Sequence, residues 1–216
     1  MKHAFKSSIV AVAMIAAAGT LAGWNSVNET VITDISNESS LIAKTYDVDP
    51  THSGVMFKLR HRGVSSFYGQ FSAIQGTIEF DKLHIERSTM ELVVPIKSIL
   101  TGDRTRDGHI KGADFLNMRQ YPEASFVSSE IKELSEGVYT VTGDFTLGGK
   151  TAVVVARLSD VQSALVNGSK LMGFEASFSI KRSDFGITKY VDPKDPEGGS
   201  LGETVELTVF IEAVGR

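Results

Sequence analysis

The residue types most often used in catalysis and metal binding gather in one stretch, DRTRDGHIKGADFLNMRQYP at positions 103–122. Its first part contains Asp103, Arg104, Arg106, Asp107, His109 and Asp114. Carboxylates close to a histidine can transfer protons or hold a metal ion. The stretch therefore raises two chemical hypotheses, an acid–base site and a metal site.

The spacing around His109 favours neither hypothesis. The chain has no HxH or HxxxH pair, so zinc would need a distant histidine such as His52 or His61. A serine nucleophile is absent from the stretch. We therefore predict no catalytic residue and no metal site. An enzyme that uses Arg106, Asp107 and His109 is kept as the weakest alternative.

A structural role accounts for the same stretch more simply. Arginine offers a planar fork to a carboxylate, and an aspartate can cap the first turn of a helix. We interpret the stretch as a short helical crossing capped by Asp103 or Asp107 and pinned by Arg–Asp pairs. Phe115, Leu116 and Tyr121 would anchor it to the rest of the domain.

The elements around this crossing show a two-residue alternation of apolar and polar side chains, which is typical of β-strands. The expected strands cover 54–61, 71–80, 88–96, 123–134, 137–149, 151–161, 170–182 and 203–214. Turn signals such as Gly148-Gly149 separate them. Strands this long favour a barrel over a sandwich. The pattern predicts an all-β fold, an extended eight-stranded antiparallel β-barrel with a short helical segment between strands 3 and 4.

The inward face of this barrel supplies the candidate ligand site. Its predicted lumen residues are Val55, Phe57, Leu59, His61, Phe71, Ile74, Ile78, Met90, Leu92, Val94, Val141, Phe145, Met172, Phe174 and Phe178. Small residues at Gly76, Gly143 and Ala176 share this face and would leave room for a long apolar ligand. A sealed core of interdigitating large and small side chains is the alternative.

Few polar residues lie where a ligand head group could meet them. We name His61, Tyr68, Arg106 and His109 as the candidates. In RSDFGI, we expect Arg182 and Asp184 to form an ion pair at the rim of the barrel. The segment 189–203 is rich in proline and glycine, which is typical of a loop that could gate an opening.

The N-terminus points to export. Residues 1–23 combine Lys2 and Lys6 with an apolar run that ends in small residues, the pattern of a cleaved secretory signal peptide. Residues 24–44 are predicted to be a flexible segment, and 45–216 the barrel domain. We expect a periplasmic or secreted protein without stable membrane insertion after cleavage. The net charge of −4 gives no basic field for nucleic acid.

The chain resembles the YceI family. The resemblance rests on YDVDPTHSGVMFKLRHRGVSSFYGQFSAIQGTIEFD, TGDRTRDGHIKGADFLNMRQYPEASFVS, YTVTGDFTLGGKT, RSDFGI and VELTVFIEA, in order over residues 45–214. Phe145 stands where this family usually has leucine. The resemblance implies a lipocalin-like barrel in a bacterial periplasmic or secreted protein.

The resemblance also implies a function and partners. Family members hold a long-chain isoprenoid, a polyprenyl lipid or an isoprenoid quinone, and several are induced by stress. We expect no cofactor beyond such a lipid or quinone, and no catalytic activity. Many members are dimers, so a homodimer is kept open. The main alternative is a ligand-free structural protein that protects under stress. The weakest alternative is an isoprenoid-modifying or hydrolytic enzyme that uses the Arg106, Asp107 and His109 cluster.

Overall fold

The structure, a computed structural model, describes residues 45–216. The predicted signal peptide at 1–23 and the flexible segment at 24–44 lie outside the described residues. Within 45–216, no helix is long and apolar enough to cross a membrane.

Long antiparallel strands make up most of the described chain. The strands are β1 (Thr45–Val48), β2 (Gly54–His61), β3 (Ser65–Phe71), β4 (Gln75–Glu79), β5 (Thr89–Pro95), β6 (Ile99–Leu100), β7 (Glu123–Ser135), β8 (Val138–Leu147), β9 (Lys150–Val166), β10 (Ser169–Lys181) and β11 (Leu201–Gly215). The helices are α2 (Arg104–Ile110) and three 3-10 turns, η1 (Ile85–Arg87), η2 (Ile96–Ser98) and η3 (Arg182–Phe185).

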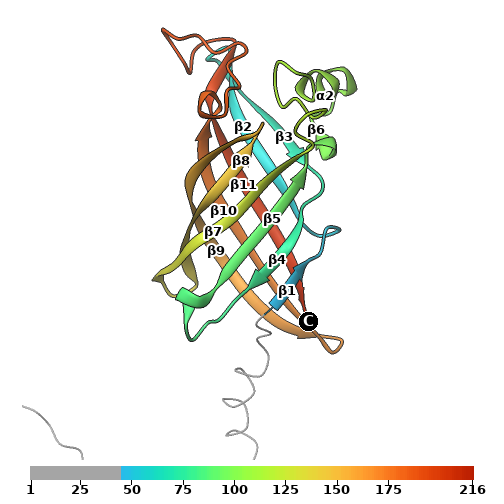
Figure 1. The fold of residues 1–216 in the computed structure, drawn as a ribbon, viewed down its shortest axis with the longest axis vertical. Coiled ribbons are helices and arrows are strands. Elements are labelled where there is room, and N and C mark those ends of the chain that lie inside the picture. Colours follow the sequence, from blue (N-terminus) through green and yellow to red (C-terminus); the bar gives the residue numbers. More distant parts are fainter. Residues whose placement is uncertain (1–44) are drawn as a thin grey trace, which may run out of the picture. The chain divides into compact units, whose positions relative to one another are not determined.

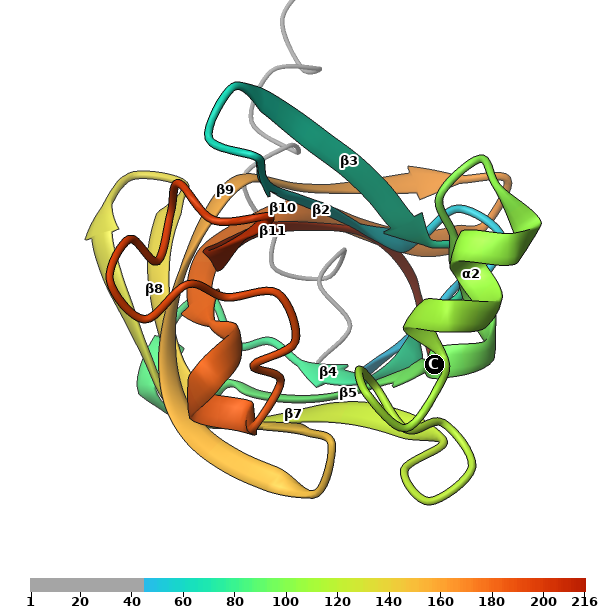
Figure 2. The ribbon, with the colours of Figure 1, turned by 90° about the horizontal axis from the view of Figure 1, so that it is seen from above.

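The sheet closes on itself as a barrel. Its order is β1-β4-β5-β7-β8-β9-β10-β11, and β11 pairs with β1 to complete the ring. Three of the eight strands of the ring are each made of two segments, β1 with β2, β3 with β4, and β5 with β6. For example, β1 and β2 both pair with β11, one after the other along its length. Figure 1 shows the inclined strands, and Figure 2 shows the ring from above. The predicted eight-stranded antiparallel barrel is confirmed, with α2 between the third and fourth strands of the ring.

The sequence prediction missed the short strands β1 and β6 and the longer strand β3. Residues 65–71 form β3, which pairs with β2 through a tight turn at Arg62 and Gly63, both with positive φ. A turn of two such residues matches the twist of a hairpin. The segment SSFYGQF contains serines and a glycine, so its alternation is weak. The prediction started the strand at Phe71 for this reason.

The crossing between β6 and β7 is built on helix α2. Asp103 caps the helix by accepting a 2.8 Å hydrogen bond from the backbone N–H of Arg106, which also lowers the pKa of its carboxyl. The only Arg–Asp hydrogen bond of the described crossing is this backbone cap, and the side chains of Arg106 and Asp107 both bond to Thr101 and not to each other. Asp107 is buried and accepts from the Thr101 hydroxyl at 2.6 Å, while Arg106 donates to the Thr101 carbonyl.

One end of the barrel is filled with large side chains. Tyr46, Ile78, Phe80, Tyr139, Met172 and Phe174 are all buried there, and so is the small Ala213. Phe80 and Tyr139 meet edge to face, with ring centroids 5.8 Å apart. Aromatic pairs in this arrangement add about 0.5–1.5 kcal/mol beyond area burial. We call this the closed end; the end beside α2 and η3 is the mouth.

Candidate ligand-binding cavity

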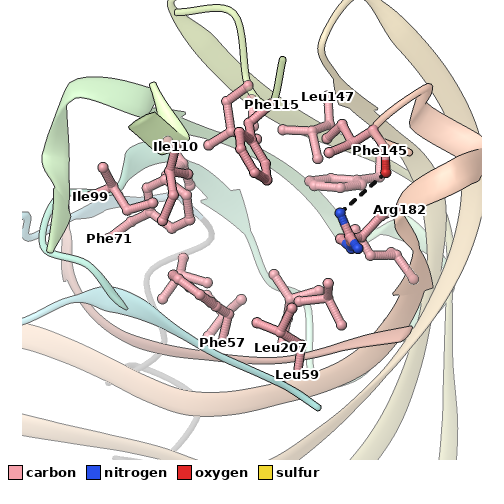
Figure 3. A pocket seen from close by; sticks show the side chains of 18 of the residues that line it. Phe57, Leu59, Phe71, Ile99, Ile110, Phe115, Phe145, Leu147, Arg182 and Leu207 are labelled. Atoms are coloured by element: carbon pink, nitrogen blue, oxygen red, sulfur yellow. Dashed lines mark hydrogen bonds between the residues drawn. The ribbon is translucent and has the colours of Figure 1, made fainter. Parts of the chain in front are cut away.

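An apolar cavity of about 940 Å³ occupies the barrel from its middle to the mouth. Strands of the whole ring contribute to its wall, and so do α2 and the segment after η3. Figure 3 shows the labelled aromatic and aliphatic side chains around the space. A volume of this size lies at the upper end of the range for small-molecule sites.

The structure places most of the predicted lumen residues on the cavity wall. These are Val55, Phe57, Leu59, His61, Phe71, Ile74, Met90, Leu92, Val94, Val141, Phe145 and Phe178. Ile78, Met172 and Phe174 also point inward and are buried, but they belong to the closed end and do not line the cavity. An inward position alone does not decide whether a side chain meets the cavity.

The four predicted head-group residues separate into two groups. His61, Arg106 and His109 line the mouth of the cavity. Tyr68 lies on the outer face of the barrel with 57% of its surface exposed, so it cannot contact a ligand inside. It pairs across the strands with the outward-facing Lys58, while the neighbouring Phe67 lines the cavity. In β3, Phe67 faces the inside of the barrel and Tyr68 faces the outside. Because the sequence prediction missed this strand, it overlooked Phe67 and chose Tyr68.

Further cavity residues were not named as ligand-binding. Several lie on the inward faces of the strands: Phe126, Leu147, Leu158, Ala176, Ile180, Val205, Leu207 and Val209. Strand alternation was the signal for this group, and Val205, Leu207 and Val209 share one face in ETVELTVFIEAV. The others, Ile110, Phe115, Leu116, Ile187 and Tyr190, lie outside the strands. Sequence alone could not place this second group over the mouth.

The inward glycines do not create the free space that the sequence suggested. A Cβ atom at Gly143 would lie 2.5 Å from the Phe126 ring, which occupies this position. A Cβ atom at Gly76 would lie 2.0 Å from the carbonyl oxygen of Glu91 on the neighbouring strand. Neither glycine lines the cavity, whereas Ala176 does. The glycines allow close packing of the protein itself.

The charged groups at the mouth are mainly cationic. Arg106, Arg182 and Lys189 line the cavity, and Asp114 is the only carboxylate in its described lining. The Arg106 guanidinium carbon lies over the Phe67 ring, 4.8 Å from its centre, within the range of a cation–π contact. The mouth therefore offers hydrogen-bond donors to an anionic or oxygen-rich group.

Arg182 is buried where η3 meets the mouth. It donates hydrogen bonds to the carbonyl oxygens of Gly202, Ile187, Lys189 and Leu201 at 2.9–3.3 Å. The expected ion pair with Asp184 was wrong, because the side chain of Arg182 turns inward to these carbonyls and Asp184 is exposed. Burial lowers the pKa of the Arg182 guanidinium. Arg182 joins the two ends of the segment 187–201, and Figure 3 shows it at the cavity wall.

Arg106, Asp107 and His109, the candidate catalytic cluster of the crossing, do not all face the cavity. Arg106 and His109 line the cavity, whereas Asp107 lies outside its lining and faces Thr101. This geometry does not assemble an acid–base pair from Asp107 and His109.

Two further groups of residues have types and spacing that could do chemistry. Neither group as a whole lines the cavity. Asp49, His52 and Glu212 bring one ligand atom each within 4.8 Å of one another on the surface. The ring nitrogen Nδ1 of His52 lies 2.7 Å from Asp49 Oδ2.

Residues 198–202 read GGSLG, which matches the G-x-S-x-G spacing of serine hydrolases and which the sequence prediction overlooked. They lead into β11, whereas a nucleophile elbow joins a strand to a helix.

The fold and cavity define a class of protein: a closed antiparallel barrel with an apolar interior that opens at one end. A family model for the YceI-like domain matches residues 46–213. A UPF0312 protein of Ectopseudomonas mendocina is 36% identical over 176 residues, which is 80% of this chain and 88% of the relative. A UPF0312 protein of Yersinia enterocolitica is 33% identical over 81% of this chain and 88% of its own length. The chain belongs to the YceI family.

Solved structures share the fold at lower identity. BcnA of Burkholderia cenocepacia matches with a TM-score of 0.64 at 23% identity, over 76% of this chain and 98% of that protein. The YCEI protein of Campylobacter jejuni gives 0.63 at 24%, over 71% and 87%. A polyisoprenoid binding domain of Saccharophagus degradans gives 0.60 at 13%, over 81% and 100%.

Proposed function

We propose that this protein binds a long-chain isoprenoid, a polyprenyl lipid or an isoprenoid quinone, with its tail in the barrel. The observation that carries the proposal is the apolar cavity of about 940 Å³, open at the mouth and filled at the other end. A branched hydrocarbon tail fits such a space, and each buried methylene contributes about 0.8 kcal/mol. The likeness to a polyisoprenoid binding domain supports the same ligand class.

The head group of this ligand is proposed to lie at the mouth. There Arg106, Lys189 and His109 offer donors, while the deeper wall carries apolar side chains such as Met90 and Val141. A tail-first orientation keeps the polar head near water and places no charge in the apolar interior, where an unpaired charge would be costly.

We place the protein in the periplasm or outside the cell, with roles in lipid transport, storage or stress response. The signal-like N-terminus and the family support this location. The protein acts as a lipid carrier and not as an enzyme. A homodimer is one proposed form of this carrier. A ligand-free protective protein is the competing function, and the open cavity argues against it.

Native mass spectrometry of the protein purified from its own host tests the proposal. We expect a mass increment equal to one isoprenoid lipid, confirmed by extraction into organic solvent, and the same spectrum reports the oligomeric state. A protein without bound lipid that also takes up no polyprenol or quinone, with no rise in melting temperature, would contradict the proposal.

A further inference from the structure

On three strands, β8, β10 and β11, the end of the cavity falls between two residues of the inward face. On β8, Val141 lines the cavity, but Tyr139 on the same face does not. On β10, the boundary falls between Ala176 and Phe174. On β11, it falls between Val209 and Ile211. Residues two apart on a strand share a face and are separated by about 7 Å along it, so each boundary is one side-chain step.

Large side chains fill the barrel just beyond this boundary. Phe174 pairs directly across the strands with Ile211, and the two are 4% and 5% exposed. Tyr139 packs against Phe80, and Ile78 on the opposite part of the ring is 1% exposed. These residues form the floor of the cavity.

Side-chain volume changes abruptly along β10 where the cavity meets its floor. Ala176 lines the cavity and pairs with Val209, whereas Phe174, one step deeper, carries an aromatic ring. The small side chain of Ala176 leaves the space above the floor open, and the ring of Phe174 closes it. Protein interiors are packed densely enough that a tail cannot pass such a layer without displacing it.

We propose that Phe174, with Ile211 across from it, sets the longest isoprenoid tail that the barrel accepts. Phe174 is a specificity-determining residue in this assignment, because its ring meets the end of the tail. The inference rests on the proposed function and adds that the ligand class is limited in length. A longer tail would have to leave the units next to its head group outside the mouth, in water.

Two substitutions move the floor in opposite directions. Phe174→Ala removes the ring and deepens the cavity toward Met172, and Phe174→Leu does so more mildly. Ala176→Phe raises the floor by one step of about 7 Å along the strand. Met56→Ala is the matched control, because Met56 lies on the outer face of β2 and is 47% exposed.

The experiment measures the affinity of each variant for a series of prenols of increasing chain length. For the natural chain we expect affinity to rise with length up to a cutoff and then to stop rising. Phe174→Ala should move the cutoff to longer tails, with at least a tenfold gain for the first length beyond it. Ala176→Phe should move it to shorter tails, and Met56→Ala should leave it in place. Circular dichroism checks that each variant is folded.

The possible failures are distinguishable. If the natural chain binds prenols but shows no cutoff, or if the cutoff is the same in Phe174→Leu and Ala176→Phe, the role of Phe174 is wrong and the lipid-binding proposal stands. Phe174→Leu and Ala176→Phe keep the test decisive even where Phe174→Ala does not fold. If the natural chain binds no prenol of any length, the proposed function itself fails and the inference falls with it.

Discussion

The ammonium of Lys189 lies 3.0 Å from Oδ2 of Asp114, and this ion pair joins two segments that are 75 positions apart in the chain. Both residues line the mouth of the cavity. Beside them the rings of Phe115 and Tyr190 pack with centroids 6.1 Å apart. The crossing after α2 and the segment after η3 are thus connected at the opening, as two parts of one cover.

Breaking this ion pair should speed ligand exchange more than it lowers stability. Lys189 and Asp114 are 42% and 69% exposed, and exposed pairs contribute only about 0–1 kcal/mol. For Lys189→Met we expect release of a bound prenol to be several-fold faster, with a small change in melting temperature. Stopped-flow displacement measures the rate.

The Lys58–Glu206 pair provides the control for this prediction. It has a similar distance of 2.9 Å, but it lies on the outer face of β2 and β11, away from the mouth. Lys58→Met should therefore leave the release rate unchanged. Equal rates in Lys189→Met and the natural chain would show that the ion pair does not restrict the opening.

Replacing Arg182 should loosen the segment 187–201. Its guanidinium donates to four backbone carbonyls from a buried position, and hydrogen bonds to charged groups contribute about 1.5–3 kcal/mol each. Arg182→Met leaves these carbonyls without their donor. We expect a clearly lower melting temperature and faster hydrogen exchange in 187–201, measured by mass spectrometry.

Lysine at the same position separates charge from geometry. Arg182→Lys keeps the positive charge but has a single ammonium, which cannot reach the carbonyls of both ends of the segment. Its hydrogen exchange should resemble that of Arg182→Met. Full protection in Arg182→Lys would mean that the charge alone holds the segment.

His52 should titrate above its ordinary pKa of 6.5. The hydrogen bond and charge of Asp49 raise the pKa of His52, with a smaller contribution from the charge of Glu212. NMR titration should show the pKa falling strongly in Asp49→Asn and less in Glu212→Gln. A larger effect from Glu212→Gln would contradict the geometry.

The same shift makes stability depend on pH. A histidine whose pKa is raised by folding stabilises the folded state fully below its unfolded pKa. That contribution is lost as the pH rises through the raised folded value. The free energy of unfolding should therefore decrease over this window in the natural chain. In His52→Gln this part of the pH dependence should be absent, as urea unfolding at several pH values would show.

Filling the cavity should remove lipid binding. Leu207 lines the cavity on β11, so Leu207→Trp would place a large ring where the tail is proposed to lie. We expect at least a tenfold loss of prenol affinity by fluorescence displacement. Val153→Trp adds the same ring on the outer surface, where Val153 is 68% exposed, and should bind normally. Equal affinities in both variants would place the ligand elsewhere.

Much of the architecture followed from local patterns. A two-residue alternation indicates which side chains face inward, because successive residues of a strand point to opposite faces. This was sufficient for the eight-stranded barrel and for inward residues such as Phe57 and Phe145. The local sequence also limited the helix cap to Asp103 or Asp107, because capping depends on neighbouring residues, and the structure then selected Asp103. Where the alternation was weak, at Phe67 and Tyr68, the prediction chose the wrong face.

Only the tertiary structure decided which inward residues meet a cavity and which fill the barrel. Phe174 and Phe178 share one face of one strand, yet Phe178 lines the cavity and Phe174 closes it. The difference depends on what faces each ring from the other strands at the same height. That height follows from the register and tilt of the strands around the closed ring. Alternation within one strand carries no information about register, so the floor and the Lys189–Asp114 contact became visible only in the folded chain.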